Sequence, residues 1–492
     1  MAYTPPFPTP LDRSKKRSLW NLFKRGRRSW LATLYEGSYS GRMSRVRLPG
    51  VQLFLVKIPD LIKEVLVERS GSFPKHELSE VVLKPLLGDS IFTTNGPTWE
   101  RQRRMLDPAF GQAKLKEVFT LMRGGSDALI ERLDQLEDGQ VADIELEMTH
   151  VTADIILRTI LSETLESDGA YKIFKAFNLF QEKAVLMIQM SFFRIPLWLA
   201  PRHYWIWKRT GREIRELLAE TIKDRYEAYQ KGEKTNHRDI LQSLLEVRDP
   251  EDGSAFTLVE LVDQVAMLFL AGHETSASAL SWSLFLISKC PEIQERLHDE
   301  SCELLGNRDP EFKDIPRHRQ IRNVFRETMR IYPPVGFLTF RKASNGQSLQ
   351  GREIPDGSPV VISPWLVHRH RELWERPDEF DPDRFEGGLD QPSCAYIPFG
   401  QGPRICIGAA FAMQEAMLIL VSLTRRYRFA PGPGPDPEPT SRLTIRSLDG
   451  IHLRVWKRGA EARVARGKEG SKDDHADQDE ETSSYEAKCP FH

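Results

Sequence analysis

The residue with the clearest chemical potential is the cysteine in segment 399–408, which reads FGQGPRICIG and fits the pattern F-x-x-G-x-R-x-C-x-G. In a glycine-containing turn at a helix start, backbone N–H groups point at the cysteine sulfur and favour the thiolate of Cys406. Gly408 lets the backbone approach a flat macrocycle, Arg404 can reach a carboxylate on it, and Phe399 would keep water from the sulfur. The segment therefore predicts a metal-ligating thiolate; the alternative is a buried structural cysteine.

A second group of unusual residues lies in the middle of a predicted apolar helix that starts after a capping box at 257–260 and ends near Lys289. Gly272 and Glu274 are unfavourable inside a buried helix, and such local conflicts often mark function. We expect Gly272 to leave room for a ligand and the Thr275 hydroxyl to bond the Ala271 carbonyl. Glu274 could pass protons through water. The alternative is a bent helix with a capped polar cluster.

The elements that must position these residues are mostly helical. Helical periodicity dominates from about 60 to 330 and returns from 408 to 426. Short strand-like runs lie at 45–58, 335–364, 442–446 and 451–457, whereas 365–410 is irregular. The pattern predicts a mainly α fold with small β-sheets (α+β) in a single large domain over 45–458. A basic leader (1–44) precedes it, and a disordered acidic tail (459–492) follows.

Composition narrows the class of protein. Lys plus Arg (69) nearly cancel Asp plus Glu (70), which gives no electrostatic case for a nucleic-acid partner. The five cysteines include no CxxC pair, which argues against a disulfide framework and a structural zinc site and favours a cytoplasmic protein. No run of about 20 apolar residues predicts a membrane-spanning helix.

Aromatic and basic residues alternate within residues 11–34. Such a segment could lie on an anionic membrane surface, and we take weak peripheral lipid binding by 11–34 as a hypothesis. The alternative is a leader that packs on the body of the protein with its charges solvated.

With these motifs in order, residues 45–458 resemble the cytochrome P450 family of haem-thiolate monooxygenases. The resemblance implies the cytochrome P450 fold, haem b as cofactor and Cys406 as the axial ligand of the haem iron. It also implies that Thr275 hydrogen-bonds the bound oxygen and that Glu274 delivers protons. The implied reaction inserts one atom of O2 into an apolar small molecule, such as a fatty acid, terpenoid or carotenoid.

The same resemblance assigns a supporting network. Glu327 and Arg330 lie three residues apart before Pro333-Pro334, upstream of the segment 377–385 that contains Arg384. In the family this trio forms a buried network that holds the cysteine loop in shape. The chain has Asp383 where the family usually has Glu.

Further haem contacts also follow from the resemblance. Trp99 and Arg103, four apart on one helix face, match a pair that binds a haem propionate. Arg341 is another propionate candidate, and His368 is a candidate haem neighbour; Ala271 and Gly272 would lie against the haem's distal face. For Arg341 and His368, the alternative is a lone exposed residue.

The family's substrate pocket corresponds here to 73–87, 174–193, the region around Ala271, 335–338 and 443–444, all poor in fixed charge. With no fused redox module, electrons must come from a separate ferredoxin or flavodoxin and its reductase, steered by Arg101, Arg104, Lys114 and Lys116. Competing functions are a peroxide-driven peroxygenase or haem isomerase and a non-catalytic haem sensor. The acid–alcohol pair of the distal helix argues against both.

Overall fold

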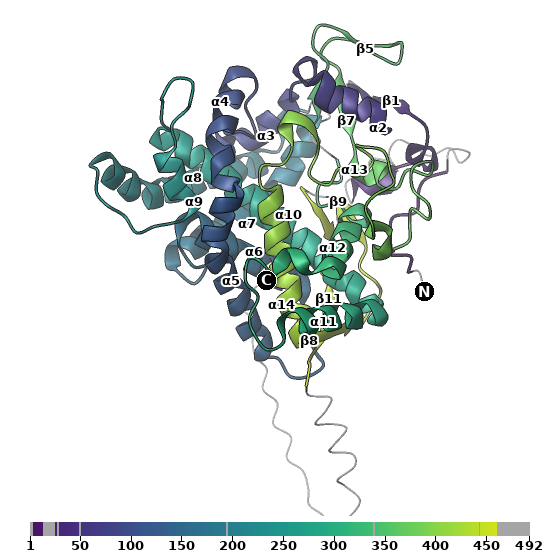
Figure 1. Ribbon diagram of the computed structural model, residues 1–492. Helices are drawn as coiled ribbons and strands as arrows, with labels where there is room; N and C mark the ends of the chain where they lie inside the picture. The colour runs from purple at the N-terminus through teal and green to yellow at the C-terminus, as the bar shows by residue number, and fades with distance from the viewer. Residues whose placement is uncertain are drawn as a thin grey trace, which may run out of the picture.

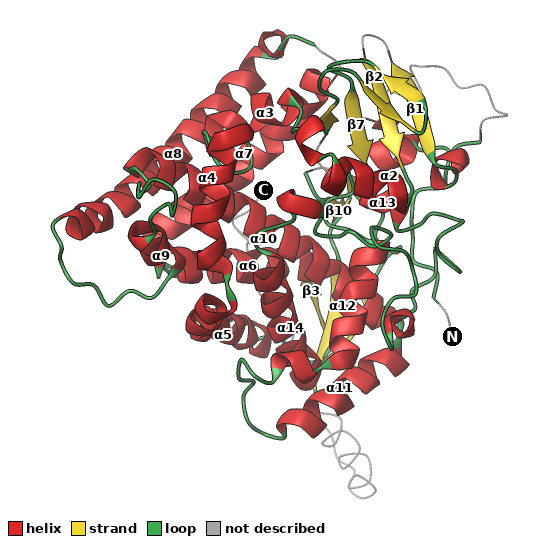
Figure 2. Ribbon diagram, turned by 45° about the horizontal axis from the view of Figure 1, so that its top comes forward, coloured by secondary structure: helices red, strands yellow, loops and turns green. Residues whose placement is uncertain are grey.

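A computed structural model describes residues 3–12, 25–26, 29–48, 51–192, 195–337, 340–441 and 443–459. Helices dominate it, and strands form small sheets at two sides (Figures 1 and 2). The longer helices are α3 (Glu77–Leu87), α4 (Gly96–Leu106), α5 (Gln112–Asp134), α6 (Ile144–Leu161), α7 (Asp168–Phe192), α8 (Pro201–Gln230), α10 (Leu258–Lys289), α11 (Pro291–Leu305), α12 (Arg319–Ile331) and α14 (Ala409–Arg426). The short helices are α2 (Pro59–Lys63), α9 (Ile240–Glu246) and α13 (Pro364–Val367).

The largest sheet among the described residues has the strand order β1-β2-β7-β4. Its strands are β1 (Met43–Leu48), β2 (Val51–Val56), β7 (Pro359–Ile362) and β4 (Arg341–Lys342). β2 and β7 pair in parallel, although about 300 residues separate them, and the other two pairings are antiparallel. The two strands predicted within 45–58 are present as β1 and β2; residues 49–50, where the break between them was predicted, lie outside the described residues. The run 335–342 was expected to be a strand; among its described residues, only Arg341–Lys342 form one, β4.

Three smaller sheets complete the fold. β3 (Gln140–Asp143), β11 (His452–Lys457) and β8 (Tyr427–Pro431) form one of them; β9 (Pro439–Ser441) pairs with β10 (Ile445–Ser447), and β5 (Gln347–Leu349) pairs with β6 (Arg352–Ile354). The mainly α prediction with small sheets is therefore confirmed.

Helix α10 passes through the centre of the molecule, with α14 beside it (Figure 1). It begins after the predicted capping box: the Thr257 hydroxyl accepts the Glu260 N–H, and the Glu260 carboxylate accepts the Thr257 N–H at 2.8 Å. Nearly every residue from Ala277 to Ser288 is buried, because α6, α12 and α14 pack around this helix. A central helix with neighbours on several sides gives a fixed platform for the residues at its middle.

The described parts of the N-terminal segment pack on the body of the protein. The Tyr332 hydroxyl donates to the Pro6 carbonyl at 2.6 Å, and the buried Tyr39 hydroxyl accepts the Trp365 Nε1–H at 3.0 Å. The basic residues 13–24 and 27–28, and the acidic tail from residue 460, lie outside the described residues. Within the described residues, no helix combines the length and apolar composition needed to cross a bilayer.

Candidate active site

A cavity of about 310 Å³ lies between the middle of α10 and the cysteine loop. Most of its wall is apolar, including Ile156 and Ile160 from α6, Met267 from α10 and Phe411 from α14. The predicted site residues that line it are Trp99, Arg103, Ala271, Gly272, Thr275, Arg341, Phe399, Arg404, Cys406 and Gly408. Sequence positions 300 residues apart thus meet around one space.

Cys406 faces this cavity from the loop between the short turn η9 (Gly402–Arg404) and α14. Its side chain is accessible from the cavity, although it lies deep among protein atoms. The pKa of the Cys406 thiol is raised above its usual value, because burial outweighs the lowering effects of the Gly408 N–H and the charge of Arg103. The Cys406 N–H donates to the Phe399 carbonyl at 2.9 Å, which fixes the loop.

The loop before Cys406 requires glycine at position 402. Its φ is +76°, in the left-handed region, and an added Cβ would collide with the Leu66 carbonyl oxygen. The turn before the cysteine therefore packs directly on the backbone of the segment η3 (Glu64–Glu68).

On the opposite wall, α10 presents Ala271, Gly272 and Thr275 to the cavity. The Thr275 hydroxyl donates to the Ala271 carbonyl at 2.8 Å, as predicted. An added Cβ at Gly272 would lie 2.5 Å from the Ile156 Cδ1, so that direction is filled by the packing of α6 on α10. Gly272 itself lines the cavity, and its role in leaving room for a ligand stays a prediction.

Glu274 points away from the cavity. Its carboxylate accepts hydrogen bonds from Arg446 at 3.1 and 2.7 Å and from the Thr444 hydroxyl at 2.8 Å. Burial raises the pKa of Glu274, but the Arg446 charge and its hydrogen bonds outweigh burial and lower that pKa to about 2. In this arrangement Glu274 is an anion held by β10 and the residue before it, not a free proton donor beside Thr275.

Three cations gather at one end of the cavity: Lys75, Arg341 and Arg404. Burial, and for Lys75 and Arg404 the charge of neighbouring arginines, lowers the pKa of each; those of Arg341 and Arg404 fall to about 10. The Arg341 Nε and Nη1 are buried and have no hydrogen-bond partner in the part of the chain that is described. Unpartnered buried cations are costly, so the cluster calls for an anionic ligand.

Neighbouring residues hold these cations in place. Arg404 stacks over the Trp99 ring at 4.1 Å and donates to the Asn95 Oδ1 at 2.9 Å. Lys75 donates to the Ile91 and Phe92 carbonyls. Arg103 donates to the Ile405 carbonyl at 2.7 Å and pairs with Asp107 at 2.7 Å.

A flat ligand with two carboxylates at one edge and a metal at its centre suits this arrangement, with Cys406 toward the metal and the cations toward the carboxylates. These residues therefore fit haem b. Sequence reasoning missed Lys75 and Asn95, because neither lies in a distinctive motif; Lys75 falls within the predicted pocket segment 73–87 but is one of several charged residues there.

His368 is not among the residues that line the cavity, and its role as a haem neighbour stays a prediction. Its Nε2 accepts the Ile397 N–H at 2.8 Å, and burial followed by the charge of Arg330 lowers its pKa to about 3. A neutral imidazole thus supports the chain just before the cysteine loop.

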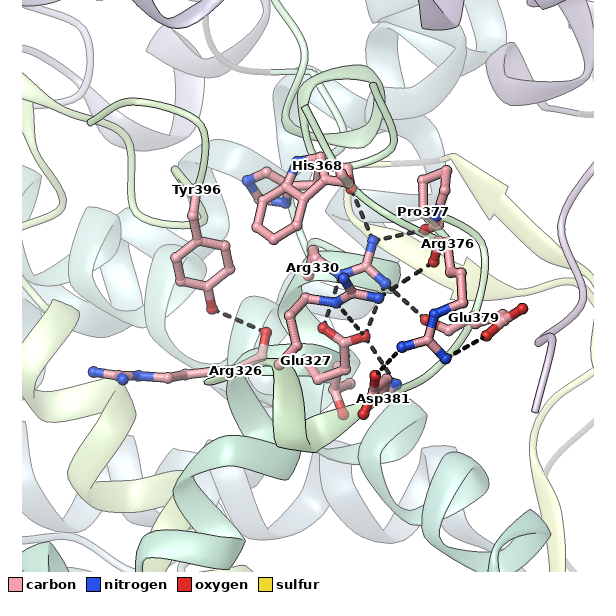
Figure 3. Close-up of polar contacts among 12 residues, drawn as sticks. Arg326, Glu327, Arg330, His368, Arg376, Pro377, Glu379, Asp381 and Tyr396 are labelled. Atoms are coloured by element: carbon pink, nitrogen blue, oxygen red, sulfur yellow. Dashed lines mark hydrogen bonds and ion pairs between the residues drawn. The ribbon is translucent and has the colours of Figure 1, made fainter. Parts of the chain in front are cut away.

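The predicted network is present behind that loop (Figure 3). Glu327 and Arg330 are fully buried and form a two-pronged pair, with Arg330 Nε and Nη2 at 2.7 and 2.8 Å from the carboxylate oxygens. Arg330 also donates to the carbonyls of His368, Pro377 and Glu379 at 2.7 to 2.9 Å. The network therefore ties α12 to the irregular segment that leads to Cys406.

Arg384 completes this network, with its Nε 3.5 Å from the Glu327 carboxylate. Asp383, the departure from the family pattern, instead pairs with Arg296 at 3.1 Å. Because Asp383 makes its contact outside the network, the substitution of Glu by Asp leaves the network intact.

The predicted pocket segments contribute unequally to the cavity. Lys75, Ala271 and Val335 line it, but no described residue of 174–192 or 443–444 does. Ile156, Ile160 and Ile240, from α6 and α9, were not expected there.

Of the cations proposed to steer a redox partner, Arg101 pairs with Glu260 at 2.7 Å, Arg104 with Asp249 at 3.0 Å, and Lys114 with Glu117 at 2.6 Å. These pairs reduce the net positive field that the three residues present.

Comparison with known proteins places the chain in a class. The family model for cytochrome P450 matches residues 14–451. Cyclooctatin synthase of Streptomyces melanosporofaciens is 32% identical over 393 residues, which cover 79% of this chain and 83% of the relative. Cyclooctat-9-en-7-ol 5-monooxygenase of the same organism is 30% identical and covers 79% of this chain and 82% of the relative.

A crystal structure of the cytochrome P450DA heme domain has a TM-score of 0.77 at 26% identity and covers 85% of this chain and 90% of that one. The chain belongs to the cytochrome P450 family. It is an oxidoreductase of the monooxygenase class with haem b as its cofactor, and the expected fold is confirmed.

Proposed function

We propose that this P450 inserts one oxygen atom into a C–H or C=C bond of a terpenoid-like apolar molecule. The proposal rests above all on the cavity, where the Cys406 sulfur and the Thr275 hydroxyl share one largely apolar space. Haem, when bound, would supply iron that activates dioxygen, with electron density donated by a cysteine thiolate. We assign that thiolate to Cys406, and the propionate contacts to Trp99, Arg103, Arg341 and Arg404, with Lys75 added.

The distal residues would handle protons. Thr275 Oγ1 is directed at the cavity and can exchange its bond to the Ala271 carbonyl for one to a molecule there. We propose that Glu274 is the proton donor and that its carboxylate must leave Arg446 to act. Proton transfer at Thr275 Oγ1 and Glu274 is the role expected of an acid–alcohol pair.

The apolar wall supports the substrate class. Isoleucine, methionine and phenylalanine side chains surround the space next to Thr275. Burial of a hydrocarbon skeleton against such a surface is energetically favourable. Two Streptomyces relatives are named cyclooctatin synthase and cyclooctat-9-en-7-ol 5-monooxygenase. These names favour a terpenoid substrate over a fatty acid or a carotenoid.

Electrons, in this proposal, come from a separate ferredoxin or flavodoxin and its reductase, and the enzyme works in the cytoplasm. Free thiols at Cys290, Cys302, Cys394 and Cys406 support a reducing compartment. Of the steering cations proposed from sequence, Lys116 has no ion pair with a described residue and is the one whose field is not offset.

The absorption spectrum of the reduced, carbon-monoxide-bound protein tests the site. Wild type should show the red-shifted band of thiolate ligation, and Cys406→Ser should lose it. Turnover of a terpenoid panel with a surrogate ferredoxin and reductase then tests the reaction. Product formation with peroxide alone but none with the electron donors would favour a peroxygenase, and a thiolate spectrum with no product under either condition would favour a sensor.

A further inference from the structure

Arg446 is shared between two carboxylates, Glu274 on α10 and Glu145 in the first turn of α6. Its Nε and Nη2 both bind Glu274, whereas its Nη1 lies 3.4 Å from the Glu145 Oε1 and 3.2 Å from the Thr149 hydroxyl. The second oxygen of Glu145, Oε2, is buried and has no hydrogen-bond partner among the described residues. Glu145 therefore holds the guanidinium loosely and has an acceptor to spare.

The strand that carries Arg446 is fixed on α10. The Ile445 carbonyl accepts hydrogen bonds from the Ser278 hydroxyl at 2.6 Å and the Trp282 Nε1–H at 2.9 Å. On the other side, the Ile445 N–H donates to the Pro334 carbonyl at 2.8 Å. Because the backbone beside Arg446 is held in this way, its buried guanidinium cannot follow a carboxylate that moves away.

The two carboxylates lie in different surroundings. Against the effect of burial, the charge of Arg446 and its hydrogen bonds lower the pKa of Glu274 to about 2. For Glu145, burial dominates and raises the pKa, helped by the charges of Asp143 and Glu274, although the Arg446 charge and the nearby Ser447 N–H lower it. Carboxylates whose pKa values are pushed apart usually have different functions. Glu145, whose side chain is 17% exposed, can thus change its charge at a pH where Glu274 stays an anion.

The other titratable groups beside this pair have partners of their own. His273 on α10 is fully buried, and burial lowers its pKa, so the imidazole is neutral at neutral pH; its Nδ1 lies 2.7 Å from the Phe269 carbonyl oxygen. Asp143 caps α6 by accepting the Leu146 N–H at 3.1 Å. Neither group is placed to exchange with a carboxylate at Arg446.

We infer that Glu145 is a positioning residue for proton delivery: its carboxylate takes over the Arg446 guanidinium when Glu274 turns toward Thr275. This inference rests on the proposed function, in which Glu274 must leave Arg446. Hydrogen bonds of the guanidinium move from one glutamate to the other, and no covalent bond changes. With Glu145 ionised, Arg446 keeps a counter-ion after the exchange; with Glu145 protonated, the exchange would leave a buried cation unpaired. Proton delivery should therefore weaken as pH falls, contrary to the behaviour of a simple acid.

A double-variant cycle tests the exchange without turnover. Denaturant midpoints are measured on the full-length, haem-loaded protein for Glu145→Gln, Glu274→Gln and the double variant. Each single variant leaves Arg446 with one carboxylate, whereas the double variant leaves it with none. The double variant should therefore lose more stability than the two single losses added together. Strict additivity would overturn the inference.

The matched control is Glu147→Gln, two residues further along α6. The Glu147 side chain is 22% exposed and pairs with Arg132 at 3.0 Å, not with Arg446. Its stability loss should simply add to that of Glu274→Gln.

The yield of product per electron consumed gives a second readout, which a purely structural role would not make dependent on pH. Limonene is the probe, with a surrogate ferredoxin and reductase. The wild-type yield should fall as pH is lowered through the raised pKa of Glu145, above the ordinary value of about 4.3. Glu145→Gln should give about tenfold less product per electron at every pH. Glu145→Asp should restore part of the yield together with its pH dependence, and Glu147→Gln should follow wild type.

The two measurements separate failure of the inference from failure of the proposed function. A Glu145→Gln protein with the wild-type yield at every pH would overturn the inference and leave the proposed function intact. A wild-type protein that forms no product from the probe would count against the proposed function, and the stability cycle would then decide the inference alone.

Discussion

Arg446 forms a bidentate pair with Glu274, although 172 residues separate them. The Arg446 Nε lies 3.1 Å from the Glu274 Oε1, and the Arg446 Nη2 lies 2.7 Å from the Glu274 Oε2. The remaining nitrogen of Arg446, Nη1, lies 3.4 Å from the Glu145 carboxylate and 3.2 Å from the Thr149 hydroxyl. If Glu274 leaves Arg446, as proposed, Arg446 would keep partial compensation from Glu145. This second carboxylate would lower the cost of releasing Glu274 toward Thr275.

Arg446→Met should leave Glu274 buried without its cation, and the variant should lose about 3–5 kcal/mol of stability near neutral pH. Wild-type Glu274 has a depressed pKa, so it stabilises the fold above the unfolded-state pKa of about 4.3, and this stabilisation is lost as pH falls through the folded pKa of about 2. In the variant, burial alone raises the pKa and this stabilisation disappears. Urea unfolding across acidic pH measures both effects.

The control for this variant is Arg296→Met, which removes the partner of Asp383 from an exposed pair. It should change stability by less than about 1 kcal/mol. An Arg446→Met protein with the wild-type midpoint and the wild-type acid profile would show that the pair does not hold Glu274 in solution.

Glu327→Ala should abolish haem incorporation. The substitution leaves the fully buried Arg330 with carbonyl partners but no carboxylate, and removes the acceptor for the Asp381 N–H, 3.0 Å away. The segment before Cys406 then loses its tie to α12. The ratio of haem absorbance to protein absorbance in the purified variant measures the effect.

Lys114 and Glu117 form an i,i+3 pair of the same spacing at the surface, so Glu117→Ala is the matched control and should retain haem. A folded Glu327→Ala protein with a full complement of haem would contradict the structural role given to the network.

Gly272→Ala should destabilise the protein by about 1–3 kcal/mol through overpacking, because its Cβ would lie 2.5 Å from the Ile156 Cδ1. Ile156→Ala on the same chain should recover much of that loss, since it removes the colliding atoms. Denaturant midpoints of the single and double variants measure the coupling. The control is Gly169→Ala in α7, where an added Cβ has open space; it should be neutral or slightly stabilising. If the stability losses of Gly272→Ala and Ile156→Ala simply add in the double variant, the contact between these residues is ruled out.

Local signals made much of the fold and the site predictable. The capping box predicted the start of α10, and its predicted end near Lys289 is also observed, because caps act through neighbouring residues. The cysteine loop was also readable from sequence, since its glycine, arginine and cysteine act within ten residues.

Contacts between distant segments could not be read in the same way. Glu274 precedes Thr275 in the sequence, but the partner that binds its carboxylate, Arg446, lies on β10 and is far away along the chain. What an added Cβ at Gly272 would meet depends on where α6 crosses α10. The orientation of the His368 imidazole is set by its hydrogen bond from the Ile397 N–H. Each of these outcomes is decided by tertiary packing, which overrides the local pattern.

Glu415 on α14 is a fully buried carboxyl group behind the cavity wall. No hydrogen bond from a described residue satisfies either of its oxygens, although the Ser276 hydroxyl lies near enough to lower its pKa slightly. Burial dominates and raises the pKa of Glu415 to about 8. The group is therefore protonated in the folded protein at neutral pH.

Because the folded pKa is raised, the native state holds a proton that the unfolded state releases above about pH 4.3. The stabilisation is fully present below that pH and falls by up to about 1.4 kcal/mol per pH unit until pH passes the folded pKa of about 8. Glu415→Gln, which is neutral at every pH, should flatten the decline of Tm between pH 5 and 8 and be more stable than wild type at pH 8. The control Glu311→Gln changes an exposed carboxylate and should keep the wild-type slope. Parallel Tm profiles for wild type and Glu415→Gln would mean that Glu415 is ionised in the fold, with a cation or ordered water as its partner.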